Sequence, residues 1–224
     1  MDKNLSFAVT SDGSKTIFNP TIGEHYHSRH GALQESKHVF LESGLKYFLQ
    51  NGTKEVKVLE LGFGTGLNYL VSAEYCKDEK VRMVYTGIEA FPLSLDLISN
   101  TDYDQYLSPE IWNEFIMTYE LALRGPTELS PYSQLEIACK KLLDFQTSQL
   151  YDVLYFDAFA AIHQPEMWNE EALSHISAFV RPGGVFVTYA ITGNLKRTMK
   201  ALGFAIEKAP GAPGKREMLR AVKL

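Results

Sequence analysis

Cysteine is scarce in this sequence of 224 residues. The two cysteines, Cys76 and Cys139, form no Cys-x-x-Cys pair, which argues against a disulfide framework, a zinc site or a redox motif. Long hydrophobic runs are also missing, since the longest apolar stretches have the length of strands. Residues 1–4 lack a basic region followed by an apolar run. We therefore expect no signal peptide, no contact with a membrane and a reducing cytoplasm as the location.

Positive charge is not in excess either, because the formal net charge is −5. This acidity disfavours a nucleic-acid partner, but the basic residues are unevenly distributed. Residues 196–224 contain eight lysines and arginines against two acidic residues. A local basic face of this kind can hold phosphates, and a solvated face without a partner is the competing interpretation.

From residue 51 onward, strand-like and helix-like segments alternate, which is typical of a doubly wound α/β fold with a mostly parallel sheet. We predict that residues 51–224 form this domain, with a helical insertion at about 101–133. Residues 1–50 are predicted to be an extension, with a hairpin and a helix near Gln34–Leu49, that covers the site. The expected strands are Val56–Leu61, Val81–Glu89, Leu135–Ala138, Asp152–Asp157 and Val185–Ala190, followed by an antiparallel hairpin of Phe204–Lys208 and Glu217–Lys223; the expected helices are Leu67–Tyr75, Pro92–Ile98, Tyr103–Leu123, Met167–Val180 and Asn194–Leu202.

A glycine-rich segment, Gly62–Gly66, follows the first of these strands and opens a helix, as a nucleotide-binding loop does. Its pattern is Gly-x-Gly-x-Gly, and Glu60 precedes it on the strand. Glu60 would repel the pyrophosphate of a dinucleotide but can attract the amino group of a methionine moiety. Glu89, at the end of the next strand, is placed to accept hydrogen bonds from ribose hydroxyls, although a surface glutamate is the simpler interpretation. Together these features favour S-adenosylmethionine over NAD.

Asp157 ends a strongly apolar strand. Ligands of open parallel sheets bind at this edge, and a carboxylate there is costly unless it faces a site or a partner. The alternative is a structural cap of the next loop. For an alkyl amine acceptor, we assign Asp157 mainly to orienting the amine, with proton removal as a secondary role. Phe159 either stacks on a base or packs in the core.

Several further segments carry a family resemblance. They are Asp157–Phe159, Pro165–Trp168, Arg181–Gly184, Pro210–Leu219, Leu33–Leu41 and Glu60–Asn68. Together they resemble the methyltransferase domain of MnmC over roughly residues 18–222. Two departures are visible: the family's Asp-Gly-Phe-Ala-Pro reads Asp157-Ala158-Phe159-Ala160-Ala161 here, and Ala138–Lys141 stands where many related enzymes have an acid near the adenine.

The resemblance implies a class I S-adenosylmethionine-dependent methyltransferase. Its implied acceptor is the aminomethyl group of 5-aminomethyl-2-thiouridine, at the wobble position of the tRNA anticodon stem-loop. It is similar to the stand-alone form without an oxidase domain, so another enzyme would supply the amine. The implied residues are Asp157 as the catalytic carboxylate; Glu60, Gly62, Phe63, Gly64, Gly66, Asn68 and Glu89 for the cofactor; and Phe159, Lys196, Arg197, Lys215 and Arg216 for the tRNA.

Three other functions stay open. The first is a methyltransferase with another amine or a protein side chain as acceptor. The second is an aminopropyl transferase on the same fold, which would have little use for Glu60. The third is a non-catalytic module that binds the cofactor or tRNA. No metal site is expected, because no carboxylate–histidine spacing completes the set begun by His25, His27, His30 and His38.

Overall fold

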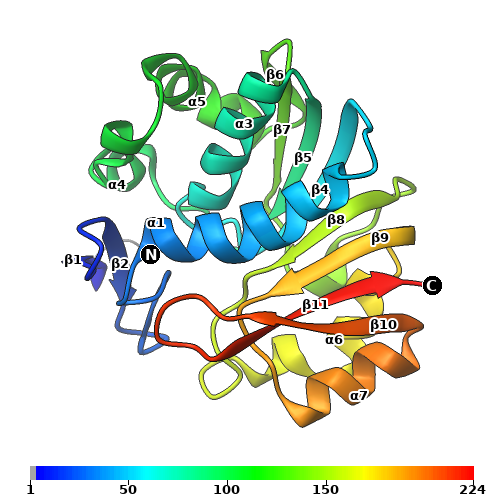
Figure 1. Cartoon of the computed structure of the whole chain (residues 1–224). Coiled ribbons are helices and arrows are strands. Elements are labelled where there is room, and N and C mark those ends of the chain that lie inside the picture. The colour runs from blue at the N-terminus through cyan, green and yellow to red at the C-terminus, as the bar shows by residue number, and fades with distance from the viewer. Residues whose placement is uncertain (1–3) are drawn as a thin grey trace.

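The computed structural model describes residues 4–224, which contain one large sheet with helices on both faces (Figure 1). The strand order is β10-β11-β9-β8-β4-β5-β7-β6. Strands β6 and β11 run antiparallel to their neighbours, and the other pairings are parallel. The bounds are β4 (Glu55–Leu61), β5 (Arg82–Ile88), β6 (Thr127–Ser130), β7 (Ser133–Ala138), β8 (Tyr151–Phe156), β9 (Val180–Thr188), β10 (Phe204–Pro210) and β11 (Glu217–Lys223).

This order places a topological switch point between β4 and β8. From β4 the chain proceeds outward through β5 and β7, and it then returns to pair β8 with the other side of β4. At such a point the two connections leave in opposite directions, so a crevice opens at the carboxyl ends of the strands. The predicted class, a doubly wound and mostly parallel sheet with a C-terminal antiparallel hairpin, is confirmed.

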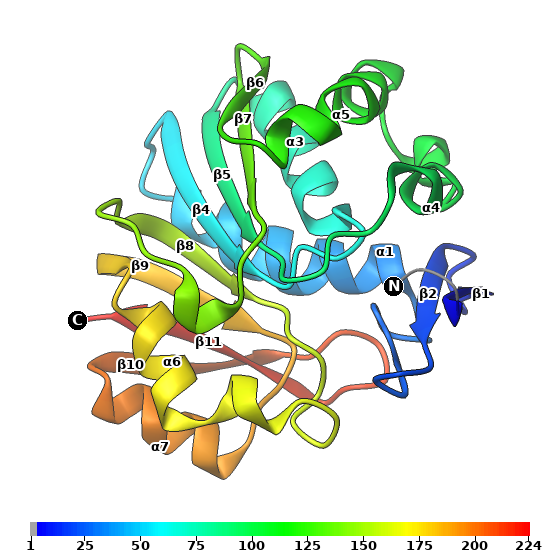
Figure 2. The same ribbon diagram turned by 180° about the vertical axis from the view of Figure 1, so that it is seen from behind.

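The helices divide between the two faces of the sheet, as Figures 1 and 2 show. One face carries a continuous helix made of α1 (Ala32–Glu35), the π-helical η2 (Ser36–Lys46) and α2 (Tyr47–Leu49), together with α3 (Leu67–Glu79), α4 (Leu95–Ser99) and α5 (Pro109–Ala122). The other face carries α6 (Glu170–Ser177) and α7 (Gly193–Ala201). Each face has its own apolar core: Phe40, Tyr69 and Phe115 belong to the first, and Leu173, Phe186 and Met199 to the second.

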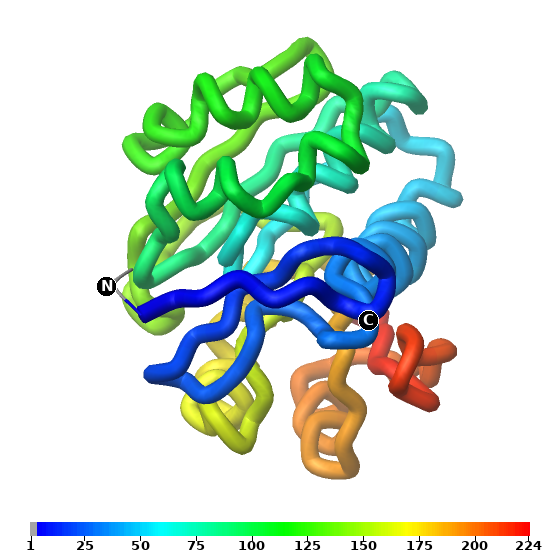
Figure 3. Tube along the Cα trace, turned by 90° about the vertical axis from the view of Figure 1, so that its left-hand side faces the viewer, coloured from blue at the N-terminus to red at the C-terminus, as the bar shows by residue number. Residues whose placement is uncertain are grey.

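The N-terminal segment forms a small separate sheet. Its strands β1 (Ser6–Val9), β2 (Lys15–Asn19) and β3 (Glu24–His25) pair antiparallel in that order. Figure 3 shows this sheet crossing in front of the edge at which the parallel strands of the large sheet end. Residues that are distant in the sequence therefore meet at the mouth of the crevice.

Several element predictions were wrong in their bounds. The helix expected over Met167–Val180 is divided into η5 (Pro165–Trp168) and α6, because the side chain of Asn169 accepts a hydrogen bond from the backbone of Ala172 and begins a new helix. Val180 already belongs to β9. The insertion Tyr103–Leu123 likewise contains η3 (Tyr103–Tyr106) and α5, which starts at Pro109. Strand β6 was not predicted. Within residues 4–224, no helix combines the length and apolarity that crossing a membrane requires.

Helix η2 packs tightly against the sheet at Gly44. A Cβ atom built there would lie 2.9 Å from Cγ2 of Val187 and 3.0 Å from the ring of Tyr155. These neighbours are buried in the centre of the sheet and have no room to move. Glycine at this position thus sets the spacing between the helix and the strands.

We predict that Gly44→Val lowers the free energy of unfolding by about 1–3 kcal/mol, because overpacking forces the helix away from the sheet. Urea unfolding of both proteins measures this difference. The control is Gly193→Ala, where a Cβ atom would meet only the end of the flexible Arg197 side chain at 3.4 Å. Equal unfolding midpoints for Gly44→Val and wild type would show that the spacing is not tight.

Candidate cofactor and acceptor site

A cavity of about 1300 Å³ opens at the switch point. Its floor is formed by the carboxyl ends of β4, β5 and β8, and its walls by β3, the end of α1 and the loop between β10 and β11. Ligand cavities for one drug-sized molecule measure roughly 300–1,000 Å³. This cavity therefore has room for a nucleoside cofactor and part of a second molecule.

The glycine loop between β4 and α3 lies on the cavity floor. Gly62, Gly64 and Gly66 have φ angles of +85°, +52° and +78°, which favour glycine. A Cβ atom at Gly62 would clash with the backbone carbonyl of Asp157, and one at Gly64 would lie 2.9 Å from the ring of Tyr26. The loop is thus enclosed between the end of β8 and the N-terminal sheet.

Glu89 follows β5 and faces the same loop. Its Oε2 accepts a hydrogen bond from the backbone of Gly64 at 3.1 Å, and its Oε1 accepts one from the backbone of Phe91 at 3.0 Å. Burial raises the pKa of the Glu89 carboxyl, and these hydrogen bonds partly oppose that effect. The carboxylate oxygens keep further lone pairs for hydroxyl groups in the cavity.

Beneath the loop, two carboxyl groups share one side-chain amide. Asn68 Nδ2, in the first turn of α3, donates to Glu60 Oε1 at 2.7 Å and to Asp157 Oδ2 at 2.8 Å. Tyr85 donates its hydroxyl to the other oxygen of Glu60 at 2.8 Å. Burial raises the pKa of both carboxyl groups well above their usual values, and the Coulombic repulsion from Asp157 raises that of Glu60 further. Only Asp157 of these residues lines the cavity.

A charged cluster surrounds Asp157 on the side away from the glycine loop. Lys215 Nζ lies 3.1 Å from Glu35 Oε1 and 3.7 Å from the ring centroid of Tyr189. Tyr189 donates its hydroxyl to the carbonyl of Ala158, and Glu24 Oε2 accepts from the backbone of Ala160, both close to Asp157 in the chain. This end of the cavity therefore holds three carboxyl groups and one ammonium group.

His27 connects the N-terminal segment to the glycine loop. Its ring nitrogens lie 3.4 Å from the hydroxyls of Thr16 and Thr65, and Thr65 belongs to the loop. Burial lowers the pKa of His27 to about 4. His27 is thus neutral at pH 7 and serves as a hydrogen-bonding link. Among residues 4–224, no three His, Cys, Asp or Glu side chains are grouped so that they could hold a metal ion.

The predicted site residues divide into three groups. Those that line the cavity are Gly62, Phe63, Gly64, Glu89, Asp157, Phe159 and Lys215. Glu60 and Asn68 lie beneath the loop, and Gly66 ends the loop at the N-cap of α3. Those outside the lining are Lys196 and Arg197 on α7, and Arg216 beside Lys215, with Arg197 and Arg216 exposed. Phe159 contacts the ring of Tyr26 edge-on at 5.2 Å between centroids.

The lining side chains that the sequence did not predict include Tyr26, Glu35, Asp144 and Tyr189. Glu35 and Tyr189 meet Lys215 only through tertiary packing, so no local pattern marks them. Asp144 had a signal, because an acid is expected after the third parallel strand. It lies in η4 (Leu142–Asp144), a few residues beyond Ala138–Lys141, where that acid was expected.

The strand order, the glycine loop and the acids at the ends of β5 and β8 define a methyltransferase fold of class I. Residues 107–224 match the family model described as S-adenosyl-L-methionine-dependent methyltransferase. The chain belongs to this family, and its cofactor is S-adenosylmethionine.

Two curated relatives carry the same printed description, tRNA 5-methylaminomethyl-2-thiouridine biosynthesis bifunctional protein MnmC. The one from Leptospira borgpetersenii is 31% identical over 87% of this chain and 31% of its own length. The one from Acidovorax is 30% identical over 92% of this chain and 34% of its own length. The resemblance to MnmC is thus confirmed, and the chain spans about a third of the length of these relatives.

Among solved structures, the crystal structure of MnmC2 from Aquifex aeolicus is similar to this one. It superposes with a TM-score of 0.77, covering 98% of this chain and 70% of that chain, at 24% identity. This similarity extends over the N-terminal sheet as well as the large sheet and establishes the shared fold.

The environment of His27 predicts a pH-dependent stability. A histidine whose pKa falls from 6.5 to about 4 on folding contributes stability that is present above pH 6.5 and lost as the pH falls toward 4. Between pH 7 and pH 5 the loss is about 2 kcal/mol. Urea unfolding at both pH values should show that the free energy of unfolding falls more for wild type than for His27→Gln. Equal decreases in the two proteins would exclude this role of His27.

Proposed function

We propose that the protein transfers a methyl group to the aminomethyl group of 5-aminomethyl-2-thiouridine at the wobble position of tRNA. The observation that carries this proposal is the position of Asp157. Its carboxyl group lies in the cavity next to the glycine loop and is held by Asn68. The printed description of the MnmC relatives, similar over most of this chain, supports the choice of acceptor.

The residues on the cavity floor fit the cofactor. The backbone of Gly62 and Gly64 would approach its methionine part, where side chains are excluded. Glu89 is placed at the end of β5, where it would accept hydrogen bonds from the ribose hydroxyls. Asp144 and the backbone beside it are the proposed adenine contacts. When bound, S-adenosylmethionine supplies a methyl group on a positively charged sulfur.

The cluster around Asp157 fits an amine acceptor. An alkyl ammonium group must lose a proton before its nitrogen has a free lone pair. Asp157 accepts a hydrogen bond from the amine and aims that lone pair, and its raised pKa makes it a competent proton acceptor. Lys215 is paired with Glu35 and only partly offsets the three carboxyl groups, which favour the protonated amine. Phe159 would pack against the acceptor base.

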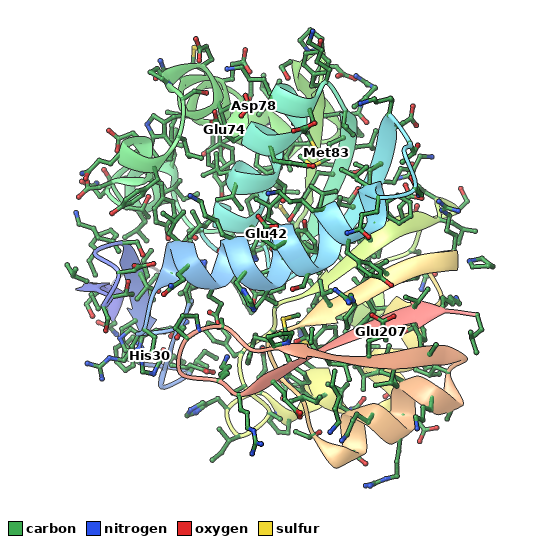
Figure 4. The ribbon with its side chains drawn as sticks, in the orientation of Figure 1. His30, Glu42, Glu74, Asp78, Met83 and Glu207 are labelled. Atoms are coloured by element: carbon green, nitrogen blue, oxygen red, sulfur yellow. The ribbon has the colours of Figure 1, made fainter. Side chains whose placement is uncertain are left out.

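The surface around the cavity fits a nucleic acid in part. Lys196 and Arg197 on α7, and Arg216 next to Lys215 in the β10–β11 loop, are proposed to contact tRNA phosphates. The ring of His30 is in contact with Gly214 of that loop, and Figure 4 shows His30 beside it. Residues 1–50 are proposed to act as a cover that holds the wobble nucleotide against the cofactor.

We expect Asp157→Asn to reduce methyl transfer by roughly 10²–10⁴-fold, because the amide cannot take a proton. Cofactor binding should persist, since an asparagine still accepts the hydrogen bond from Asn68. Single-turnover transfer of labelled methyl to tRNA that carries the aminomethyl group measures the first effect, and calorimetry the second. Asp104→Asn, at an exposed position, is the control. Full activity of Asp157→Asn would contradict the proposed role.

Lys196, Arg197 and Arg216, which we call the basic rim, generate a separate prediction. Replacing Lys196, Arg197 and Arg216 together by glutamine should weaken tRNA binding and reduce the slope of log K against log salt by up to about 3. Binding titrations over a range of salt concentrations test this. The matched control replaces Lys54, Lys77 and Lys80, which lie at the opposite edge of the sheet. If both triple variants behave alike, the rim makes no specific contact.

A further inference from the structure

Two carboxyl groups at the acceptor end of the cavity each keep one oxygen without a protein partner. Glu24 accepts a hydrogen bond from the backbone of Ala160 at 2.8 Å through Oε2. Asp157 accepts one from Asn68 at 2.8 Å through Oδ2. No hydrogen bond or ion pair formed within residues 4–224 uses Glu24 Oε1 or Asp157 Oδ1. Both side chains line the cavity, so these two oxygens can accept hydrogen bonds from a ligand.

The other charged groups of this end are already engaged with each other. Glu35 Oε1 lies 3.1 Å from Lys215 Nζ, and Glu35 Oε2 accepts a hydrogen bond from the backbone of Ser28 at 2.8 Å. Opposite charges paired in this way largely neutralise each other toward a third group. The acceptor capacity left for a ligand therefore belongs to Glu24 and Asp157.

Glu24 and Asp157 are held near each other by the loop that follows β8. Ala160, whose backbone donates to Glu24, lies three positions after Asp157. Burial is the main cause that raises the pKa of Asp157, and repulsion from Glu24 contributes to it. The rings of Phe159 and Tyr26 join the same two segments edge-on, 5.2 Å apart between centroids. Two independent contacts thus fix the N-terminal segment against this loop, and each segment brings one acceptor oxygen.

We propose that Glu24 is a specificity-determining residue that, together with Asp157, limits the reaction to one methyl group per amine. The inference rests on the proposed function, in which the acceptor is a primary amine. After the arriving ammonium has given one proton to Asp157 or to water, its two N–H groups donate to Glu24 Oε1 and to Asp157. The remaining position on nitrogen holds the lone pair, which is thereby aimed at the methyl group of the cofactor.

The product of this reaction retains a nitrogen that can react again. When the lone pair forms the bond to the methyl carbon, the electron pair of the carbon–sulfur bond stays on sulfur, and the acceptor becomes a secondary ammonium. Loss of one proton restores a lone pair, so the chemistry alone permits a second transfer. Selection against that transfer must come from the site.

A site with two acceptor oxygens supplies that selection. A neutral secondary amine has a single N–H group, so with its lone pair aimed at the cofactor its methyl group must face either Glu24 or Asp157. The carboxylate that faces the methyl group then has no donor for its oxygen, and an unpaired acceptor costs more than an ordinary hydrogen bond contributes. The primary amine satisfies both oxygens and is therefore preferred.

Methyl transfer by the whole protein to two tRNA acceptors tests the proposal. One tRNA carries the aminomethyl group and the other the methylaminomethyl group, and mass spectrometry of the wobble nucleoside counts the methyl groups added. We expect the wild type to prefer the primary amine about 10–100-fold in kcat/KM, the effect of losing one hydrogen bond to a charged group. Equal rates on the two acceptors would overturn the proposal.

The variant Glu24→Gln tests the residue itself. Its carbonyl oxygen can still accept from the backbone of Ala160, but the rest of the amide presents N–H groups to the amine. We expect the preference for the primary amine to fall about tenfold, with dimethylated nucleoside accumulating on long incubation. If Glu24 only holds the loop, both acceptors slow equally and the ratio stays at the wild-type value, which would refute this role.

Two further proteins complete the experiment. Glu24→Ala removes both oxygens and should reduce the preference at least as much, so it decides the matter if Glu24→Gln does not fold. Glu42→Gln, which changes an exposed carboxylate paired with Lys46 on η2, is the control and should keep the wild-type ratio (Figure 4). If the wild type methylates neither tRNA, the proposed function fails instead.

Discussion

The contact between the glycine loop and the end of β8 determines how the rest of the site is built. Gly62 lies against the backbone carbonyl of Asp157, and the backbone of Asp157 donates a hydrogen bond to the carbonyl of Leu61 at 3.0 Å. Because no side chain separates the two segments, the loop and the acidic residue are fixed relative to each other. Asn68 then joins their functional groups through one amide. A cofactor seated on the loop and an acceptor held by Asp157 would consequently meet at a fixed distance.

The N-terminal segment completes the cavity from the opposite side. Tyr26 covers the glycine loop, His27 bonds to Thr65 of that loop, and Glu35 pairs with Lys215. These contacts combine a neutral histidine, an aromatic ring and an ion pair, and each touches a different part of the site. The extension is therefore packed into the site by several independent interactions.

The sequence predicted those features whose cause is local. The central strands β4, β5 and β8 are apolar runs, and the glycine loop is marked by its spacing between a strand and a helix. Strand β6 was missed because it is a short edge strand of mixed polarity, Thr-Glu-Leu-Ser. The start of α6 was misplaced because a single capping side chain, Asn169, outweighs the apolar periodicity around it. The partners of Glu60 and Lys215 could not be predicted, since each pairing depends on how distant segments fold together.

The ion pair between Glu35 and Lys215 joins residues separated by 180 positions along the chain. The β10–β11 loop therefore closes one wall of the cavity by docking Lys215 against Glu35 of the N-terminal segment. This wall depends on the first and the last parts of the described chain at once, so a change in either hairpin alters the same corner of the cavity.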